Sequence, residues 1–398
     1  MSKLKELIEK FCPNGVEYQK LDDILDYEQP TQYIVKSTEY DDSYNTPVLT
    51  AGQTFILGYT NEEDGIYKAD KDSPTIIFDD FTTSFHWVDF DFKVKSSAMK
   101  MLRPKSTFEG SFKYVFYAME CIHFEAVNHT RHWISKYSQF EIPLPHPEVQ
   151  EEIVKILDRF AEYAAELQAE LQARQEQYEY YRDKLLTFNE IGGGIQDVIW
   201  MKMSEIGTFV RGKRFVRTDI VNDGVPCIHY GDMYTYYGLY ATKSKGMLRS
   251  ELAPKMRYAQ KNDVVIVAAG ENKEDIGIGM AWLGDEPAAV HDACFIFKSD
   301  LYPQYVSHYL RTNYYHKQIV KHVSEGKICS ISAKGLGNAI IPIPSYEEQV
   351  RIATLLNKFD ELVSDLVQGL PAEIAAVKEQ YEYYRNKLLS FPEYKLSA

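Results

Sequence analysis

The sequence has no long hydrophobic run. Its longest purely apolar stretch, residues 264–269 (VVIVAA), is far shorter than the roughly 18 residues that a membrane-spanning helix needs. The N-terminal segment MSKLKELIEKF alternates charged and apolar side chains, which predicts a short amphipathic helix rather than a signal peptide. We therefore expect a protein that crosses no membrane and stays in the cytoplasm.

Cysteine is also scarce, with five residues in a chain of 398. They are widely scattered, and no Cys-x-x-Cys pair is present to bind zinc or to carry out redox chemistry. An odd number of distant cysteines does not fit a disulfide framework. We expect buried free thiols and no metal site in this chain.

Motifs for nucleotide and cofactor binding are missing too. No G-x-G-x-x-G follows a predicted strand, and neither Gly212-Lys213 nor Gly326-Lys327 is followed by the Ser or Thr of a P-loop. We therefore expect no cofactor in this chain and no catalysis by the chain alone.

The net charge of -14 does not fit a simple basic nucleic-acid binder, because phosphate contacts need Lys and Arg. The distribution is uneven, however. Residues 1–150 contain 15 basic and 24 acidic side chains, whereas residues 191–345 contain 18 basic and 15 acidic ones. Such a chain would bind DNA weakly alone and would benefit from a partner that supplies positive charge.

A long internal repeat dominates the sequence. Residues 142–160 (IPLPHPEVQEEIVKILDRF) align without gaps on 341–359 (IPIPSYEEQVRIATLLNKF), and both copies share an Ile-Pro-x-Pro entry and a Gln. Further on, 178–188 (YEYYRDKLLTF) match 381–391 (YEYYRNKLLSF). The offset rises from 199 to 203, so the second copy is four residues longer.

Apolar residues in both copies recur at alternating spacings of four and three, which predicts a helix with one packing seam. The first helix, from about 148 to 188, would be about 60 Å long at roughly 1.5 Å per residue, too long to pack inside one domain. Only Arg174 breaks its seam. The seam positions that we single out for helix pairing and subunit docking are Leu157, Phe160, Leu167, Leu171, Tyr178, Tyr181, Leu356, Phe359, Leu366, Tyr381 and Tyr384.

The four extra residues of the second copy fall beside Gly369-Leu370-Pro371. Because Gly and interior Pro cost roughly 1 and 3 kcal/mol of helix stability, we expect a break there, with Pro371 starting the next helical piece. A heptad stretch alone commonly indicates homodimerisation. Two matching copies in one chain favour antiparallel pairing of the two helices with each other.

The globular segments repeat more weakly. Residues 15–24 (GVEYQKLDDI) and 197–206 (DVIWMKMSEI) both open with an extended stretch that leads into a short helix, and the sequences then diverge. A duplicated scaffold that carries diverged domains suits a protein that recognises two different targets.

The order of globular domain and long helix, repeated once, with Ile-Pro-x-Pro entering each helix and YEYYR-KLL-F closing it, resembles the specificity (S, HsdS) subunits of type I restriction-modification enzymes. The resemblance covers essentially the whole chain and includes TPVLTAGQTFILGYT (46–60) and IIFDDFTTSF (76–85). It implies an α+β fold with two target recognition domains of mixed sheets, separated by two long antiparallel coiled-coil helices in a pseudo-twofold arrangement. The expected segments are recognition domain 1 (1–146), spacer helix 1 (147–190), recognition domain 2 (191–345) and spacer helix 2 (346–398).

The same resemblance implies that each domain recognises one half of a split, asymmetric site in double-stranded DNA, and that the helices set the spacer between the halves. The helices would also dock two methylation (M) subunits, which methylate adenine N6 with S-adenosylmethionine. Restriction (R) subunits would add ATP- and Mg²⁺-dependent translocation and cleavage. AAEL followed by QAEL (164–171) looks like two of the tetrapeptide repeats that change the spacer in this family.

For DNA contact, the best cluster is four cations within 211–217 around a flexible Gly212, and a solvated charged loop is the alternative. Two loops before the helix entries, 129–138 and 325–334, share an Ile-Ser core flanked by cations. Ordinary turn or strand-surface roles are the alternative for the other candidates. The candidates for DNA contact are Thr50, Gly52, Thr54, Thr82, Thr83, His86, Arg131, Lys136, Arg211, Lys213, Arg214, Arg217, Tyr230, Lys243, Lys245, Lys327, Ser330 and Lys334.

Two other function classes compete with this interpretation. Asp79 and Asp80, followed by Asp91-Phe92-Lys93, have the order of acids and lysine found in many Mg²⁺-dependent nucleases. However, the alternation of apolar and charged residues in VDFDFKVK (88–95) is explained by a half-buried strand. The other alternative is a coiled-coil adaptor without DNA specificity.

Overall fold

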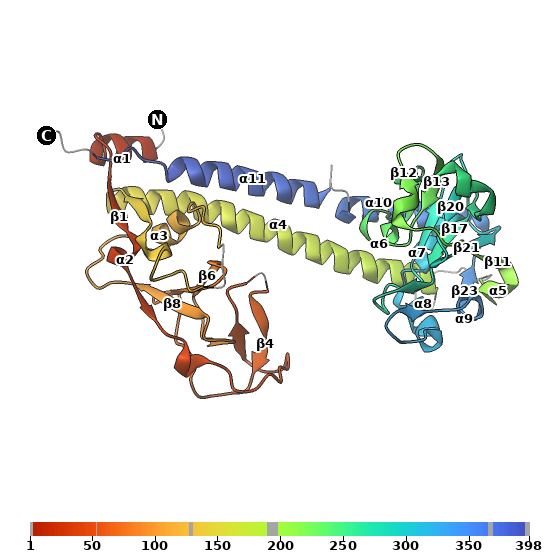
Figure 1. Ribbon diagram of the computed structural model, residues 1–398, viewed down its shortest axis with the longest axis horizontal. Coiled ribbons are helices and arrows are strands. Elements are labelled where there is room, and N and C mark those ends of the chain that lie inside the picture. The colour runs from red at the N-terminus through yellow and green to blue at the C-terminus, as the bar shows by residue number, and fades with distance from the viewer. Residues whose placement is uncertain (1–2, 53, 127–129, 189–197, 365–368, 395–398) are drawn as a thin grey trace. The chain divides into compact units, whose positions relative to one another are not determined.

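The computed structural model describes residues 3–52, 54–126, 130–188, 198–364 and 369–394 (Figure 1). The chain divides into two compact units. Unit 1 comprises Met1–Glu166 and Ile374–Ala398, and unit 2 comprises Leu167–Glu373. Each unit therefore takes residues from both copies of the repeated helix. The segment boundaries expected at residues 146, 190 and 345 stay predictions.

Unit 1 combines short helices with strands along its length. Its elements are α1 (Lys3–Phe11), β1 (Glu17–Lys20), α2 (Leu21–Ile24), β2 (Leu25–Glu28), η1 (Thr31–Tyr33), β3 (Thr46–Leu49), β4 (Ile56–Thr60), β5 (Thr75–Asp79), β6 (Phe85–Val88), β7 (Lys93–Val94), β8 (Met99–Pro104), α3 (Phe112–Met119), η2 (Tyr137–Gln139), β9 (Glu141–Leu144), the first half of α4 (Pro147–Thr187) and most of α11 (Leu370–Leu388).

Unit 2 begins within α4 and has more strands. Its further elements are β10 (Ile199–Lys202), α5 (Met203–Ile206), β11 (Gly207–Arg211), η3 (Arg217–Asp219), β12 (Ile220–Val221), β13 (Val225–Ile228), α6 (Asp232–Thr235), β14 (Tyr240–Ala241), β15 (Gly246–Leu248), η4 (Ser250–Lys255), β16 (Tyr258–Ala259), β17 (Val264–Val267), β18 (Ala269–Gly270), β19 (Gly279–Trp282), β20 (Ala288–Val290), β21 (Cys294–Ser299), α7 (Pro303–Tyr309), α8 (Asn313–Ile319), η5 (Val320–His322), β22 (Cys329–Ser330), α9 (Ala333–Gly337), β23 (Ile340–Ile343) and α10 (Tyr346–Ser364).

Both units contain mixed sheets, as expected for an α+β fold. In unit 1 the strand orders are β2-β8-β5-β6 and β4-β3-β7, with β3 and β7 parallel. In unit 2 they are β11-β21-β17-β19-β14 and β12-β15-β13-β20-β16, with β13 and β20 parallel. The central strands β5 and β17 are almost fully buried, and each contains a continuous apolar run, residues 76–78 and 264–267, rather than an alternating pattern.

The predicted start of each globular segment is confirmed. The extended stretch becomes β1 and leads directly into α2 in unit 1, and β10 leads into α5 in unit 2. Each strand pairs antiparallel with the Ile-Pro-x-Pro strand that precedes a long helix, β1 with β9 and β10 with β23. The duplication therefore extends to the pairing register, since Glu17 lies opposite Leu144 and Ile199 opposite Ile343.

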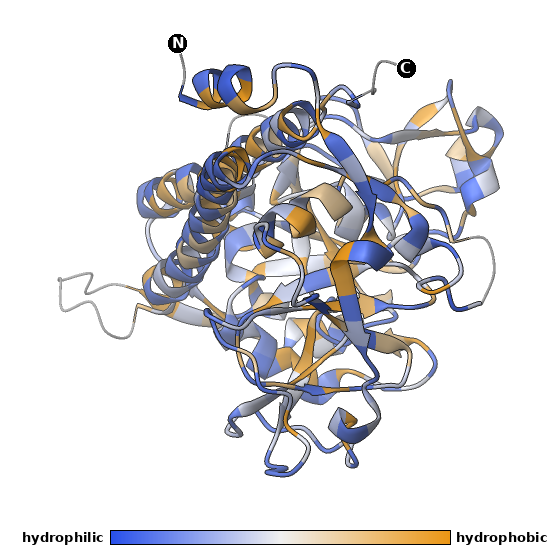
Figure 2. Cartoon of the chain, turned by 90° about the vertical axis from the view of Figure 1, so that its left-hand side faces the viewer, coloured by the Kyte–Doolittle hydropathy of each residue, from blue (hydrophilic) through white to orange (hydrophobic). Residues whose placement is uncertain are grey.

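The long helix α4 spans 41 residues, in agreement with the predicted range of about 148 to 188. Pro147 starts it, a position that suits proline because the first helical N–H has no partner within the helix. Figure 2 shows hydrophilic residues interrupted by apolar ones along the long helices, as the heptad spacing requires. Arg174, the residue that breaks the seam, is exposed and bonds to Glu170 and Gln177.

In unit 1, the first half of α4 packs against α11 in an antiparallel sense. The ring of Phe160 stacks on Tyr384 at 5.5 Å, while Ile153, earlier in α4, shares a core with Phe391, later in the chain. In unit 2, the second half of α4 packs against α10 in the same sense. The ring of Tyr181 stacks on Phe359 at 6.4 Å, and Leu186 and Ile352 share the core.

The expected break in the second helical copy is confirmed. Helix α10 ends at Ser364, and α11 begins at Leu370 with Pro371 as its second residue. Leu366, one of the predicted seam residues, lies outside the described residues. The buried side chains on either side of the break, Val363 and Leu370, keep to the predicted seam.

A repeated glutamine fixes the start of each long helix. In unit 1, Gln150 donates to the Pro145 carbonyl at 2.7 Å and accepts from the Ser111 N–H at 2.8 Å. In unit 2, Gln349 donates to Pro344 at 3.0 Å and accepts from Tyr302 at 2.9 Å. Each glutamine therefore ties the long helix to the start of the helix that comes after the sheets, α3 or α7.

Helices α3 and α7 also contact the long helices through equivalent, partly buried polar pairs. In unit 1, the Tyr117 hydroxyl donates to Asp158 at 2.5 Å. In unit 2, His308 bonds to Asn357 at 2.8 Å, and its Nδ1 lies 3.1 Å from the Tyr178 hydroxyl. The Asn357 oxygen is an acceptor, so His308 Nε2 carries the proton and Nδ1 accepts from Tyr178.

We predict that His308 makes unit 2 sensitive to acid. Burial lowers the pKa of His308 to about 4 from an ordinary value of 6.5. Between these pH values the unfolded chain takes up a proton that the folded chain does not, so stability is lost as the pH falls from 6.5 toward 4, by roughly 3 kcal/mol in total.

Urea unfolding of the wild type and of His308→Gln between pH 7.5 and pH 4.5 measures this effect. The glutamine keeps a donor for Asn357 but does not titrate, so its stability should fall less with acidity. Equal pH dependence in the two proteins would contradict the assignment.

Candidate nucleic-acid interface

The loop that comes after β11 in unit 2 is held firmly by its backbone. The N–H of Gly212 bonds to the Cys294 carbonyl at 3.0 Å, and that of Lys213 bonds to Val290 at 2.9 Å. A Cβ at Gly212 would lie 2.2 Å from the His291 carbonyl oxygen. The interpretation of Gly212 as a flexible position is therefore wrong, because this glycine is required by close packing of the backbone.

This anchored loop presents cations to solvent. Lys213, Arg214 and Arg217 are exposed, and none of them forms an ion pair within the part of the chain that the structure describes. Arg211 differs, because its Nε donates to the Asp292 carbonyl at 2.8 Å. Three of the four predicted cations are thus free to contact an anionic ligand.

A cavity of about 460 Å³ lies beside the loop. It brings together three candidates, Arg214, Arg217 and Tyr230, with Ile328 from the distant loop 325–334. Its lining also includes Phe215, Val216, His229, Ala269, Gly270, Glu271, His291, Asp292 and Ala293. Both cations and carboxylates therefore border a single cavity.

Four rings form one wall of this cavity. His291 lies 4.8 Å from His229, 5.0 Å from Tyr230 and 5.1 Å from Phe215, measured between ring centroids. Phe215, His229 and His291 are buried, whereas Tyr230 is half-buried. The sequence interpretation missed Phe215, His229 and His291. The two histidines each come directly after a buried strand, in CIHY (227–230) and AAVHDA (288–293), which is the signal that could have indicated them.

The two histidines are held in defined tautomers. Nδ1 of His229 accepts from the Gly231 N–H at 3.2 Å, and Nδ1 of His291 accepts from Ala293 at 3.1 Å. Burial lowers the pKa of both rings, and the neighbouring Arg217 and Arg214 add to the effect at His229 and His291 respectively. Each ring is therefore neutral at pH 7 and carries its proton on Nε2.

The remaining candidates in unit 2 lie in several places. Lys245 forms an ion pair with Asp232 at 2.9 Å, which reduces its availability to DNA. Lys243 borders a separate cavity of about 340 Å³ together with Asp285 and Glu286. Lys327 and Lys334 are exposed, whereas Ser330 pairs with Ala269 beside the ring-lined cavity.

The two loops before the helix entries correspond in position. The His132 N–H bonds to the Asp80 carbonyl at 2.8 Å, and the Ile331 N–H bonds to Ala268 at 2.9 Å. These equivalent residues are 199 apart, like the helix entries. The Ile-Ser pairs at 134–135 and 331–332 are 197 residues apart, so they do not occupy equivalent positions in this register.

In unit 1 the turn between β3 and β4 gathers four candidates. The Thr50 hydroxyl donates to the Thr54 carbonyl at 2.8 Å and accepts from the Gly52 N–H at 3.2 Å. Nε2 of His86 lies 3.0 Å from the Gly52 carbonyl oxygen, which fixes the imidazole against the turn. This arrangement presents the exposed Thr54 beside a half-buried imidazole.

The other candidates in unit 1 are less uniform. Thr82 is exposed, but Thr83 is buried with a φ of 60°, so its side chain belongs to the turn rather than to a DNA-facing surface. Arg131 and Lys136 are exposed, and the Lys136 ammonium lies 5.9 Å from the Phe124 ring. Their roles in DNA contact stay predictions.

The nuclease-like acids have structural partners. Asp79 accepts two turn N–H bonds, from Phe81 and Thr82. Asp80 is buried against Lys100 at 3.3 Å, and Asp91 pairs with Lys68 at 2.6 Å. Among the described residues, no group of three or more His, Cys, Asp or Glu side chains is placed to hold a metal ion.

The lysine of the same pattern is also engaged. Lys93 is buried, pairs with Glu62 at 3.1 Å and donates to the Asp64 carbonyl at 2.6 Å. The expected continuous strand over 88–95 is interrupted, since β6 ends at Val88 and β7 covers only Lys93–Val94. Burial of Lys93 departs from the alternation that the sequence predicted.

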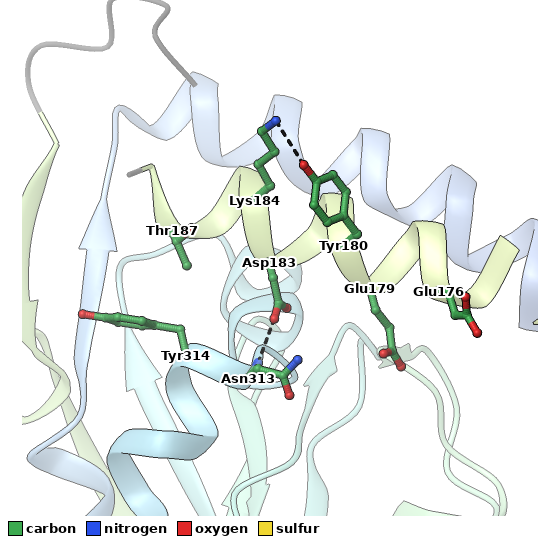
Figure 3. Close-up of a pocket in the computed structure, with 8 residues that line it drawn as sticks. All are labelled: Glu176, Glu179, Tyr180, Asp183, Lys184, Thr187, Asn313 and Tyr314. Carbon is green, nitrogen blue, oxygen red and sulfur yellow. Dashed lines mark hydrogen bonds between the residues drawn. The ribbon is translucent and has the colours of Figure 1, made fainter. Parts of the chain in front are cut away.

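A second cavity of unit 2, of about 560 Å³, lies along the end of α4 (Figure 3). Asp183 accepts the Asn313 N–H at 3.1 Å and thus fixes the start of α8 against α4. Tyr180 is 59% exposed, and Lys184 donates to its hydroxyl at 3.4 Å. The acids Glu176 and Glu179 also line this cavity.

The same exposed tyrosine recurs in unit 1. Tyr383, at the equivalent place in the second YEYYR, is also 59% exposed, and Lys387 lies 5.5 Å from its ring, as Lys184 does from Tyr180. By contrast, the predicted docking residues Tyr178 and Tyr381 direct their hydroxyls to His308 and to Glu120. The sequence interpretation missed Tyr180 and Tyr383, although the repeat contained them.

Comparison with known proteins identifies the family. The protein-family model described as "Type I restriction modification DNA specificity domain" matches this sequence twice, at residues 13–177 and 197–376. The chain belongs to the type I restriction-modification specificity subunits. This family supplies DNA sequence specificity and is itself non-catalytic, because the catalytic activities lie in partner subunits.

Relatives match along the full length. The chain is 39% identical to the specificity subunit of the type I restriction enzymes EcoR124I and EcoR124II of Escherichia coli, with 99% of this chain and 98% of the relative covered. It is 28% identical to a putative type I specificity subunit of Haemophilus influenzae, with 98% and 100% covered.

Two solved structures share the fold of this specificity subunit. The S subunit of M. genitalium gives a TM-score of 0.53 at 15% identity, with 94% of this chain and 96% of that chain covered. A chain from a structural study of the complex assembly and conformational transition of a type I system gives a TM-score of 0.58 at 15% identity, with 95% of this chain and 98% of that chain covered. Among the described residues of this chain, no helix is long and apolar enough to span a membrane.

We predict that Gly212→Ala displaces the cationic loop of the specificity subunit. The added methyl group would clash with two main-chain carbonyl oxygens, at a cost of roughly 1–3 kcal/mol. The assembled complex should unfold at a lower temperature and bind DNA more weakly. Gly238→Ala is the control, since a Cβ there meets no atom within 4 Å. Equal effects of the two substitutions would refute the packing argument.

Proposed function

We propose that each globular domain of this chain recognises one half of a bipartite, asymmetric site in double-stranded DNA. The observation that carries the proposal is the double match to the DNA specificity domain, each matched range being followed by the same YEYYR helix motif. The three unpaired cations beside the ring-lined cavity support it for the second domain, because such side chains contact phosphates and base edges.

The long helices set the spacer between the two half-sites and dock two methylation subunits. The repeated Tyr180 and Tyr383 support two equivalent docking places, since exposed tyrosines are enriched where proteins associate. The seam residues beneath them hold the helices together. The expected number of two methylation subunits agrees with the two copies of the YEYYR motif.

Partner subunits provide the chemistry in this proposal. The methylation subunits bind S-adenosylmethionine and methylate adenine N6, and restriction subunits use ATP and Mg²⁺ to translocate and cut unmodified DNA. The complex works in the cytoplasm. Because this chain has a net charge of -14, its partners also contribute much of the positive charge that holds DNA.

Mapping of methylated adenines tests the proposal as a whole. The chain is co-expressed with the methylation subunit of its own system in a host that lacks adenine methylation, and the host genome is sequenced. A bipartite motif with a fixed spacer is expected. Random methylation, or no association between the subunits, would refute DNA specificity and favour a simple coiled-coil adaptor.

Deleting Gln168 to Leu171 should shorten the spacer and preserve both half-sites. Four residues contribute about 6 Å of helix, nearly two base-pair steps at roughly 3.4 Å, and their loss rotates the remainder of the helix by only about 40°. The methylome of the variant complex measures the spacer directly. The double substitution Gln168→Ala and Glu170→Ala, at two exposed positions, keeps the length and should keep the spacer. An unchanged spacer in the deletion variant would defeat the ruler role.

Tyr180→Ser and Tyr383→Ser should each weaken the binding of one methylation subunit, because each removes an exposed ring from one of two equivalent places. Native mass spectrometry of the co-purified complexes should show mostly one bound subunit for each single variant and little binding for the double variant. The exposed Tyr163 on α4, changed to Ser, is the control. Full two-to-one assembly of the double variant would contradict the docking assignment.

A further inference from the structure

The ring-lined cavity of unit 2 contains a histidine donor without an acceptor among the described residues, in addition to the unpaired Arg214 and Arg217. His229 is 6% exposed, and its Nδ1 is occupied by the Gly231 N–H. Within the residues that the structure describes, the ring of His229 forms its hydrogen bond through Nδ1, and no protein acceptor is bonded to its Nε2–H. Since His229 lines the cavity, this N–H is available to a bound group.

His291 is the central ring of the wall. Its Nδ1 accepts from the Ala293 N–H at 3.1 Å, and its ring lies 4.8 Å from that of His229 and 5.1 Å from that of Phe215. His291 therefore packs against His229 and supports the position of that ring.

The charges around the cavity distinguish a base from a phosphate. Arg214 and Arg217 supply donors, as a phosphate would need, but the carboxylates of Glu271 and Asp292 border the same space and would repel an anion. A G·C pair presents the matching mixture in the major groove, with two acceptors on guanine and one amino donor on cytosine.

We propose that this cavity recognises a G·C pair in the DNA half-site of the second domain, with His229 Nε2–H and an arginine, Arg214 or Arg217, donating to guanine and Glu271 accepting from cytosine. The inference rests on the proposed function and adds to it a base and the residues that select it. The loop anchored at Gly212 fixes the backbone from which Arg214 and Arg217 extend. Because Nδ1 of His229 is bonded to Gly231, the ring offers the cavity only its Nε2–H donor.

The test compares two substitutions of His229 in the complete complex with methylation subunits. In His229→Asn, the amide oxygen can replace Nδ1 as acceptor for Gly231, while the Nε2 donor is lost. In His229→Gln, the longer side chain can return a donor near Nε2. Methylome sequencing should show that the asparagine variant relaxes one G·C position of one half-site by about ten-fold or more, and that the glutamine variant partly restores it.

Controls separate this inference from the proposed function and from misfolding. His322→Asn, in the same unit but outside the cavity lining, should leave the motif unchanged. If a variant methylates nothing, competition binding with duplexes altered one base pair at a time replaces the methylome and must show the same relaxed position.

Two outcomes would overturn the G·C assignment while leaving the proposed function intact. One is a wild-type motif with no G·C pair in the half-site that the second domain recognises. The other is a His229→Asn complex whose preference is unchanged at every position. A wild-type complex without any bipartite motif would instead refute the proposed function itself.

Discussion

The structure depends on antiparallel pairing between two copies of one helix sequence. Because the copies run in opposite directions, the start of α4 packs against the end of α11 in unit 1, and the end of α4 packs against α10 in unit 2. Each unit thereby contains an Ile-Pro-x-Pro entry from one copy and a YEYYR exit from the other. The repeated glutamines Gln150 and Gln349 then fix each domain to its own helix start.

Features set by local sequence could be predicted. Helix α4, the break before Leu370 and the strand-to-helix starts at β1 and β10 depend on periodicity, Gly and Pro, all of which act over a few residues. Burial of Lys93 could not be predicted, since its carboxylate and carbonyl partners come from about 30 residues earlier in the chain. A similar long-range argument holds for the packing of Gly212 on His291.

The candidate site was predicted in part for the same reason. The residue types of the cationic loop and Tyr230 were enough to predict them as candidates. Their association in one cavity depends on the parallel pairing of β13 with β20, which places Ile228 opposite Val290 and so brings His229 beside His291. Strand partners of such sequence separation are determined by the whole sheet. The repeat itself held a further signal, because KYVFYAME (113–120) and QYVSHYLR (304–311) correspond and contain the contacts of α3 and α7 with the long helices.

Those contacts limit how such a chain can evolve. In unit 1, Tyr117 bonds to Asp158, and Glu120 forms an ion pair with Arg385. At the equivalent places in unit 2, His308 bonds to Asn357, and Arg311 lies in the electrostatic environment of Asp360. Arg182, the counterpart of Arg385 in the first YEYYR copy, also lies in the electrostatic environment of Arg311 and Asp360, so both units keep an arginine at this place. A domain moved onto the opposite helix pair would therefore meet an arginine in either half, but Tyr117 would exchange Asp158 for Asn357 as its partner, and His308 would exchange Asn357 for Asp158.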